Sequence, residues 1–261
     1  MKKLSVLCFF LIGMCMFLFV GNVFADENVE NIETWIVDDF DSGTQLHGAD
    51  REWTWVVRGS KFITKDEEGN PLLKHKLVDG YPDALYSRQD VEGKEVRVLG
   101  IEGGFDRRGY NYLEIIPVAK DEEGNLKSHP IELKGRVKSI DLWAWGAGYN
   151  YYLEVHLLDG NGLNYHLVLG DLAFKGWKNL SVAIPTAIPQ HRRYVNQKAA
   201  LSLTKLVVWT QPTEKVDEFR VFIDQLKIIT DTFISKFDGD ELADPDVIEK
   251  LWTEGEDFQG N

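Results

Sequence analysis

The chain is poor in cysteine: Cys8 and Cys15 are the only two, and both lie in an apolar N-terminal segment. Cys15 follows Met14 and Cys8 lies too early in the segment, so neither fits a lipid-attachment cysteine. Without that segment the protein has no cysteine, which excludes disulfides and a cysteine nucleophile. Stability must therefore come from a packed core, and a chain of this size can bury roughly 70% or more of its unfolded surface.

The N-terminal segment has the parts of a secretory signal peptide in the usual order. Lys2 and Lys3 precede an apolar run from Leu4 to Val20, and Val23-Phe24-Ala25 supplies a cleavage site. We expect residues 1–25 to be removed, by cleavage between Ala25 and Asp26. A membrane anchor is less favoured, because the run is near the lower limit for crossing a bilayer and a cleavage site follows it. The mature protein is then exported and carries no membrane segment.

Positive charge is also scarce. The formal net charge is −13 and becomes −15 once Lys2 and Lys3 are removed with the signal peptide. Such an acidic surface disfavours nucleic acid and anionic lipid as partners. It also means that any self-assembly works against like charge.

The common catalytic motifs are missing. The chain contains no Gly-x-Ser-x-Gly elbow, no Walker loop and no His-Glu-x-x-His sequence. No strand carries the alternating carboxylates with which some β-sandwich glycosidases flank a sugar bond. The sequence therefore predicts a protein that is not an enzyme and has no organic cofactor.

Short segments with alternating apolar residues are what the chain has in abundance. They recur between turn residues, at Val96–Leu99, Tyr112–Val118, Ile140–Trp145, Tyr151–Leu158, Tyr165–Leu169, Leu180–Ile184, Leu203–Trp209 and Val221–Ile229. This pattern predicts an all-β, jelly-roll-like β-sandwich over residues 26–230, similar to carbohydrate-binding modules. Residues 231–261 are expected to form a linker and a short helix, which Asp244 caps and Pro245 begins.

One hexapeptide occurs twice, as Lys65–Asn70 and as Lys120–Asn125. An acidic ion-binding loop or a duplicated unit would be one interpretation. Two hairpin tips, each with glycine in the left-handed conformation, are the favoured one, because the similarity ends with these six residues.

The segments around Asp159–Gly162 form a predicted hairpin whose register decides which side chains share a face. Pairing Leu158 with Leu163 places His156 and His166 on opposite faces, so that they could not share a metal ion. His166 then belongs to the core face.

In that register too many apolar side chains remain for the opposite face. The candidate contact residues there and on the preceding strand are Trp143, Trp145, Tyr152 and Tyr165. They could stack on a sugar, contact another subunit or lie beneath loops of the same chain.

Carboxylates at the two ends of the predicted sandwich suggest a second site. Asp38, Asp39 and Asp41 follow the first strand, and Asp224 lies in the last. The first and last strands of a jelly roll often pair, which would bring these oxygens together as ligands for a structural Ca²⁺. Ordinary turn carboxylates are the favoured alternative in so acidic a chain.

Two segments are the most specific part of a resemblance to a known family: Phe-Lys-Gly-Trp-Lys-Asn-Leu at Phe174–Leu180 and Ile-Asp-Gln-Leu-Lys at Ile223–Lys227. With their surroundings they resemble the FlaA family of spirochaete flagellar outer-layer proteins. The resemblance implies a sheath subunit in the periplasmic flagellum, which coats a core of flagellin-like FlaB subunits, contacts other FlaA-type subunits and influences filament shape and stiffness. A periplasmic carbohydrate-binding module is the alternative. Within the first segment, Trp177 is expected to close one end of the sandwich.

Overall fold

The computed structural model of the protein describes residues 30–41, 45–46, 49–85, 92–93, 95–190, 201–232, 249 and 252–253. The chain divides into two units, of which the first, Met1–Glu30, contains a single described residue, Glu30. The predicted cleavage site at Ala25 and Asp26 lies outside the described residues. Within the described part, no helix has the length and apolar character needed to cross a bilayer.

The second unit, Asn31–Asn261, is built from β-strands. They are β1 (Ile32–Asp38), β2 (Gln45–Leu46), β3 (Ala49–Asp50), β4 (Thr54–Gly59), β5 (Lys74–Asp79), β6 (Arg97–Gly103), β7 (Tyr112–Lys120), β8 (Leu126–Ser128), β9 (Ile131–Glu132), β10 (Arg136–Ala147), β11 (Tyr152–Leu158), β12 (Asn164–Asp171), β13 (Lys175–Ala183), β14 (Ser202–Trp209) and β15 (Phe219–Asp231). The strands confirm the all-β prediction.

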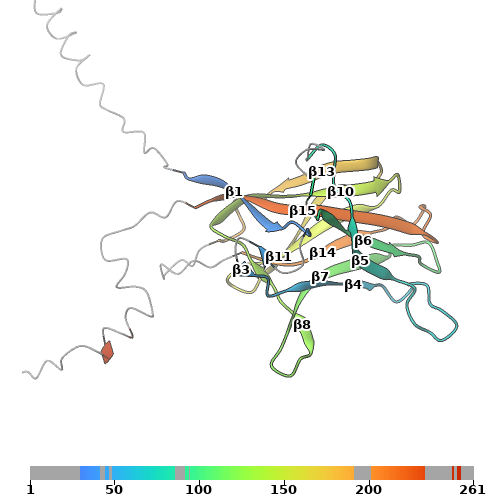
Figure 1. The fold of residues 1–261 in the computed structure, drawn as a ribbon, viewed down its shortest axis with the longest axis horizontal. Helices are drawn as coiled ribbons and strands as arrows, with labels where there is room; N and C mark the ends of the chain where they lie inside the picture. The colour runs from blue at the N-terminus through green and yellow to red at the C-terminus, as the bar shows by residue number, and fades with distance from the viewer. Residues whose placement is uncertain are drawn as a thin grey trace, which may run out of the picture. The chain divides into compact units, whose positions relative to one another are not determined.

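Two sheets lie face to face as a sandwich (Figure 1). Sheet I has the order β13-β10-β15-β6-β5, with β1 paired to β15. Sheet II has the order β12-β11-β14-β7-β4, with β8 on β7 and β9 on β14. β2 and β3 form a separate short ladder.

The core lies between the sheets because alternate residues of each strand point inward. On β11 the inward residues Leu153, Val155 and Leu157 are fully buried. On β10, in sheet I, the inward residues Ile140, Leu142 and Ala144 are buried as well. Burial of these apolar faces is the main force that stabilises the fold.

The repeated hexapeptides form hairpin tips, as predicted. Gly69 and Gly124 have φ angles of 87° and 84°, in the left-handed region that glycine tolerates best. In each tip an aspartate, Asp66 or Asp121, accepts backbone N–H groups of the turn through its carboxylate. Figure 1 shows the β7–β8 hairpin, which carries the second tip, extending away from the two sheets.

The predicted register of the β11–β12 hairpin is wrong by one residue. The turn closes with a hydrogen bond from Asp159 N to Leu163 O, and Asp159 Oδ1 accepts the N–H of Leu163. Leu158 therefore pairs with Asn164, and His156 lies opposite His166. The loop thus has one residue more than predicted, which moves every β12 side chain to the other face.

The corrected register changes which side chains belong to the core. Tyr165 and Leu167 pack against the hydrophobic core, whereas Val168 is 55% exposed. His166 is exposed on the outer face, and its ring stacks on that of His156. The prediction that His166 belongs to the core face is wrong for the same reason.

The expected meeting of the first and last strands does occur. β1 pairs antiparallel with β15, and Asp38 lies opposite Leu226. In the C-terminal segment, Glu249, Trp252 and Thr253 are helical, and the remainder of the predicted helix lies outside the described residues.

Candidate functional site

The outer face of sheet I carries a row of aromatic side chains that spans three strands. Trp145 on β10 lies opposite Phe222 on β15 and opposite Trp177 on β13. Directly opposed residues of an antiparallel pair project on the same face, so the three rings share one surface. Trp143, two residues before Trp145, belongs to the same face. We call these four residues, Trp143, Trp145, Trp177 and Phe222, the aromatic band.

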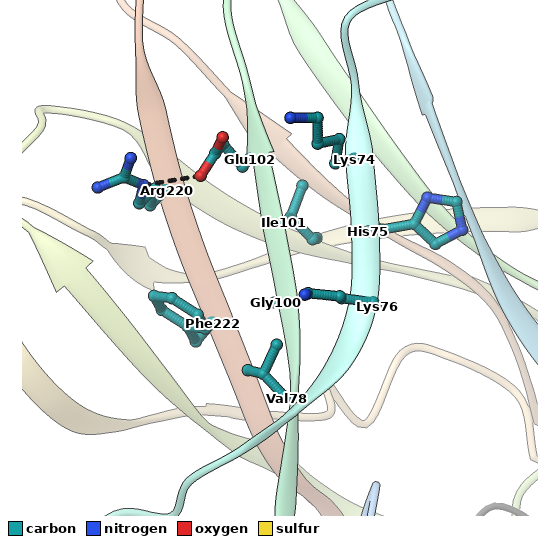
Figure 2. A pocket seen from close by; sticks show the side chains of 9 residues that line it. All are labelled: Lys74, His75, Lys76, Val78, Gly100, Ile101, Glu102, Arg220 and Phe222. Carbon is teal, nitrogen blue, oxygen red and sulfur yellow. Dashed lines mark hydrogen bonds and ion pairs between the residues drawn. The ribbon is translucent and has the colours of Figure 1, made fainter.

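The aromatic band continues into a groove of about 340 Å³ over β5, β6 and β15. Its lining residues, drawn in Figure 2, are Lys74, His75, Lys76, Val78, Gly100, Ile101, Glu102, Arg220 and Phe222. Phe222 belongs to both features and joins them. The groove thus has an apolar floor and a charged rim.

Strand pairing explains how the groove is built. Lys76 on β5 lies opposite Gly100 on β6, and Gly100 lies opposite Phe222 on β15. In Figure 2 Lys76 reaches across Gly100 towards Phe222. A Cβ atom at Gly100 would lie 3.1 Å from the Phe222 ring and 3.4 Å from Val78 Cγ2. Glycine therefore keeps the floor of the groove open.

Among the charged side chains of the rim, Arg220 and Glu102 form an ion pair. Arg220 Nε donates to Glu102 Oε2 at 2.9 Å, and this bond and its charge lower the pKa of Glu102. Lys74 lies opposite Glu102 in the strand pairing. Neither Lys74 nor Lys76 is within ion-pairing distance of a carboxylate in the described part of the chain. The groove consequently has an excess of positive charge.

The four predicted contact residues do not form one patch. Trp143 and Trp145 lie together on the outer face of sheet I. Tyr152 is on the outer face of sheet II, where it stacks on Trp209 with centroids 6.4 Å apart. Tyr165 packs against the core, and its hydroxyl donates to Asp159 at 3.1 Å.

Two members of the aromatic band were missed by the sequence reasoning. Trp177 does not close an end of the sandwich: it lies within β13, opposite Trp145. Phe222 alternates with the core residues Val221 and Ile223, and this alternation was a signal of its outward position. No local signal identified Lys74 or Lys76, because their significance depends on strands far away in the sequence.

The carboxylates proposed as calcium ligands do come near one another. Asp38 is buried and accepts hydrogen bonds from Arg51 at 2.7 and 2.9 Å and from Trp55 Nε1 at 2.7 Å. Burial, followed by the neighbouring charges of Asp41, Asp39 and Asp38, raises the pKa of Asp224 to about 8. Burial also raises the pKa of Asp39.

This acidic cluster does not have the geometry of a cation site. Within the described residues, no group of three or more His, Cys, Asp or Glu side chains is placed to hold a metal ion. Both oxygens of Asp38 are engaged by the guanidinium of Arg51. The cluster instead takes part in holding the segment after β1 against sheet I, where Asp41 Oδ1 accepts the N–H of Arg97 on β6.

Comparison with known proteins gives a family match. The model of the family described as "Flagellar filament outer layer protein Flaa" matches residues 74–238. A flagellar filament outer layer-like protein of Brachyspira hyodysenteriae is 24% identical over 218 residues, which are 83% of this chain and 86% of the relative. The flagellar filament outer layer protein of Borreliella burgdorferi is 26% identical over 136 residues, 48% of this chain and 40% of that protein.

Solved structures with some likeness include carbohydrate-binding modules. The family 11 module of a Clostridium thermocellum cellulase has a TM-score of 0.39 at 10% identity, over 77% of this chain and 96% of the module. A module from a study of promiscuous β-sandwich carbohydrate-binding modules has a TM-score of 0.39 at 12% identity, over 66% of this chain and 55% of that chain. At these scores the likeness says nothing about a ligand.

Proposed function

Because the chain belongs to the family of flagellar filament outer layer proteins, FlaA, we propose that it is a structural subunit of the periplasmic flagellar sheath. In this role it coats a core of flagellin-like FlaB subunits and contacts other FlaA-type subunits. The coat in turn affects the shape and stiffness of the filament. The family match over residues 74–238, which contain the whole groove, is the observation that carries the proposal.

The outer face of sheet I supports a contact role. Aromatic side chains supply large contact areas and are the commonest interface hot spots. Trp143, Trp145, Trp177 and Phe222 are each only partly buried in the isolated chain. Their row across β13, β10 and β15 presents a surface that a neighbouring protein could cover.

The proposed role requires export and no catalysis. The signal peptide expected at residues 1–25 leads to the periplasm, whereas a flagellin core subunit would show long helical heptads in place of these strands. The charged side chains of the groove pair with one another, as Arg220 does with Glu102, or border an apolar floor. None of them forms a nucleophile-and-base arrangement of the kind that covalent catalysis needs.

Fractionation of periplasmic flagella tests the proposal. The mature chain should co-purify with intact filaments and be released by a mild wash that leaves the flagellin core in place. Deletion of the gene should give thinner filaments with altered curvature in electron micrographs. Recovery of the chain only in the soluble periplasm, with unchanged filaments in the deletion strain, would contradict the role.

Sugar binding is the alternative outcome. Calorimetric titration of the mature protein with soluble glucans and peptidoglycan fragments should give no heat of binding. Saturable binding that Phe222→Ala abolishes would favour a periplasmic carbohydrate-binding module.

A further inference from the structure

The groove is a positive feature on a strongly negative protein. Glu102 is the one carboxylate among the lining residues, and Arg220 pairs both with it and with Glu218 beside the groove, at 3.5 Å. The positive excess therefore comes from Lys74 and Lys76. The chain as a whole has a formal charge of −13. A positive groove on a negative protein favours an acidic partner. Complementary charge steers that partner to the groove, and repulsion between like charges disfavours contacts elsewhere on the surface.

An acidic hairpin tip is present on the same chain. The β7–β8 hairpin ends in Lys120–Asn125, in which the turn engages the carboxylate of Asp121. Glu122 and Glu123 remain exposed at the tip, and Leu126 directly after it is 48% exposed. Two carboxylates beside one apolar side chain complement two lysines beside the apolar floor at Phe222.

We propose that the groove of one copy binds the β7–β8 tip of a second copy, head to tail. This inference rests on the proposed function as a coat subunit. Glu122 and Glu123 would pair with Lys74 and Lys76, and Leu126 would cover the floor that Gly100 keeps open. The contact overcomes the repulsion between acidic copies because it places opposite charges together locally.

The position of the two elements favours a growing array. The groove lies on sheet I and the tip extends from sheet II, so the two halves of the contact are different surfaces. When two different surfaces form the contact, a row of copies has an unoccupied groove at one end and an unoccupied tip at the other. Further copies can therefore add, and the row can grow into a helical assembly. The first tip, Lys65–Asn70, lies shortly before β5, the edge strand of sheet I that borders the groove, so it is placed differently from the second tip relative to the groove.

Charge exchange provides the test, with self-association of the mature protein measured by sedimentation velocity at low and high salt. Lys74→Glu with Lys76→Glu should weaken self-association at least tenfold, and so should Glu122→Lys with Glu123→Lys. All four changes in one chain restore the original net charge and should restore self-association. High salt should weaken the contact in the wild type.

The identical first tip supplies a matched control. Glu67→Lys with Glu68→Lys, combined with the reversed groove, has the same net charge as the wild type but should not rescue assembly. Rescue by this control, or unchanged self-association in both reversals, would overturn the inference. Circular dichroism and the melting temperature of each variant separate loss of contact from loss of fold, and the four-change protein serves where one reversal folds poorly.

Gly100→Val gives an independent readout without a change in charge. The added side chain fills the floor of the groove and should also weaken self-association at least tenfold. Co-sedimentation of the wild type with flagellar filaments is measured in parallel. Failure to bind filaments contradicts the proposed function, whereas filament binding with charge-insensitive self-association contradicts only the head-to-tail contact.

Discussion

Trp145 and Phe222 meet edge to face on neighbouring strands of sheet I, with ring centroids 5.3 Å apart and planes at 83°. Edge-to-face contact is one of the two preferred arrangements of aromatic pairs, so each ring holds the other in place. The pair joins the aromatic band to the groove, and both rings remain partly exposed. A fixed aromatic surface of this kind is suited to contact with another protein.

Trp145→Ala should therefore weaken binding to filaments much more than it weakens the fold. Truncation of a central interface aromatic often costs 2 kcal/mol or more, which is about thirtyfold in Kd. Co-sedimentation with filaments measures the binding, and thermal unfolding measures the fold. Tyr152→Ala, on the outer face of sheet II, is the control that should bind like the wild type. Equal loss with both variants would contradict a contact confined to sheet I.

Asp38→Ala should strongly destabilise the protein. The carboxylate of Asp38 is fully buried, and the side chain of its partner Arg51 is only 6% exposed. Removing one member leaves a buried charge without compensation, which typically costs 3–5 kcal/mol. The melting temperature should fall by about 10 °C or more. Asp38→Asn also loses the charge but keeps an acceptor for Trp55 Nε1, so its melting temperature should fall less. Equal falls for the two variants would show that this hydrogen bond contributes nothing and that the whole loss comes from the charge.

Asp224→Asn should make the protein relatively more stable as pH rises. Burial raises the pKa of Asp224 to about 8 in the folded state, whereas an aspartate of an unfolded chain has a pKa of about 3.9. Stability due to this group is thus complete below about pH 4 and is lost as pH rises through about 8, by at most about 1.4 kcal/mol per pH unit. Urea unfolding at pH 5 and pH 8 should show that the free energy of unfolding of the variant rises relative to that of the wild type. The same difference between the two proteins at both pH values would contradict the raised pKa of Asp224.

The same two proteins test the calcium hypothesis. If Asp38, Asp39, Asp41 and Asp224 hold Ca²⁺, added calcium should raise the melting temperature of the wild type and not that of Asp224→Asn. Since Arg51 occupies both oxygens of Asp38, we expect calcium to change neither.

His156→Gln should reduce the loss of stability in weak acid. Burial lowers the pKa of His156, although its hydrogen bond with Glu154 opposes the shift, and the nearby His166 lowers the pKa further. A histidine with a lowered folded-state pKa contributes stability above about pH 6.5 that is lost as pH falls below that value. Unfolding between pH 7.5 and pH 5 should show a shallower slope in the variant.

His75→Gln is a suitable comparison, because burial lowers the pKa of His75 as well, on β5 and far from the histidine pair. The two substitutions should therefore have additive effects on the slope. A slope that neither substitution changes would place the acid sensitivity elsewhere.

The family and the fold class could both be inferred from the sequence. Alternation of apolar residues with a period of two is a local property, and it identified strands such as Tyr112–Val118 and Leu203–Trp209 close to their observed bounds. The hexapeptide turns were equally local, because glycine and aspartate in the tip determine the backbone by themselves. The pairing of the first strand with the last followed from the fold class.

The tertiary structure alone decided which strands meet and in which register. One residue in the loop after Asp159 reversed the faces of β12, and the sequence permitted both loop lengths. The aromatic band joins Trp145, Trp177 and Phe222, and the groove joins Lys76 to Gly100 and Phe222, through pairings between distant segments. Sequence determines which residues of one strand share a face, because that is set by the backbone. Which faces of different strands align is set by packing of the whole core, and the candidate site depends on that alignment.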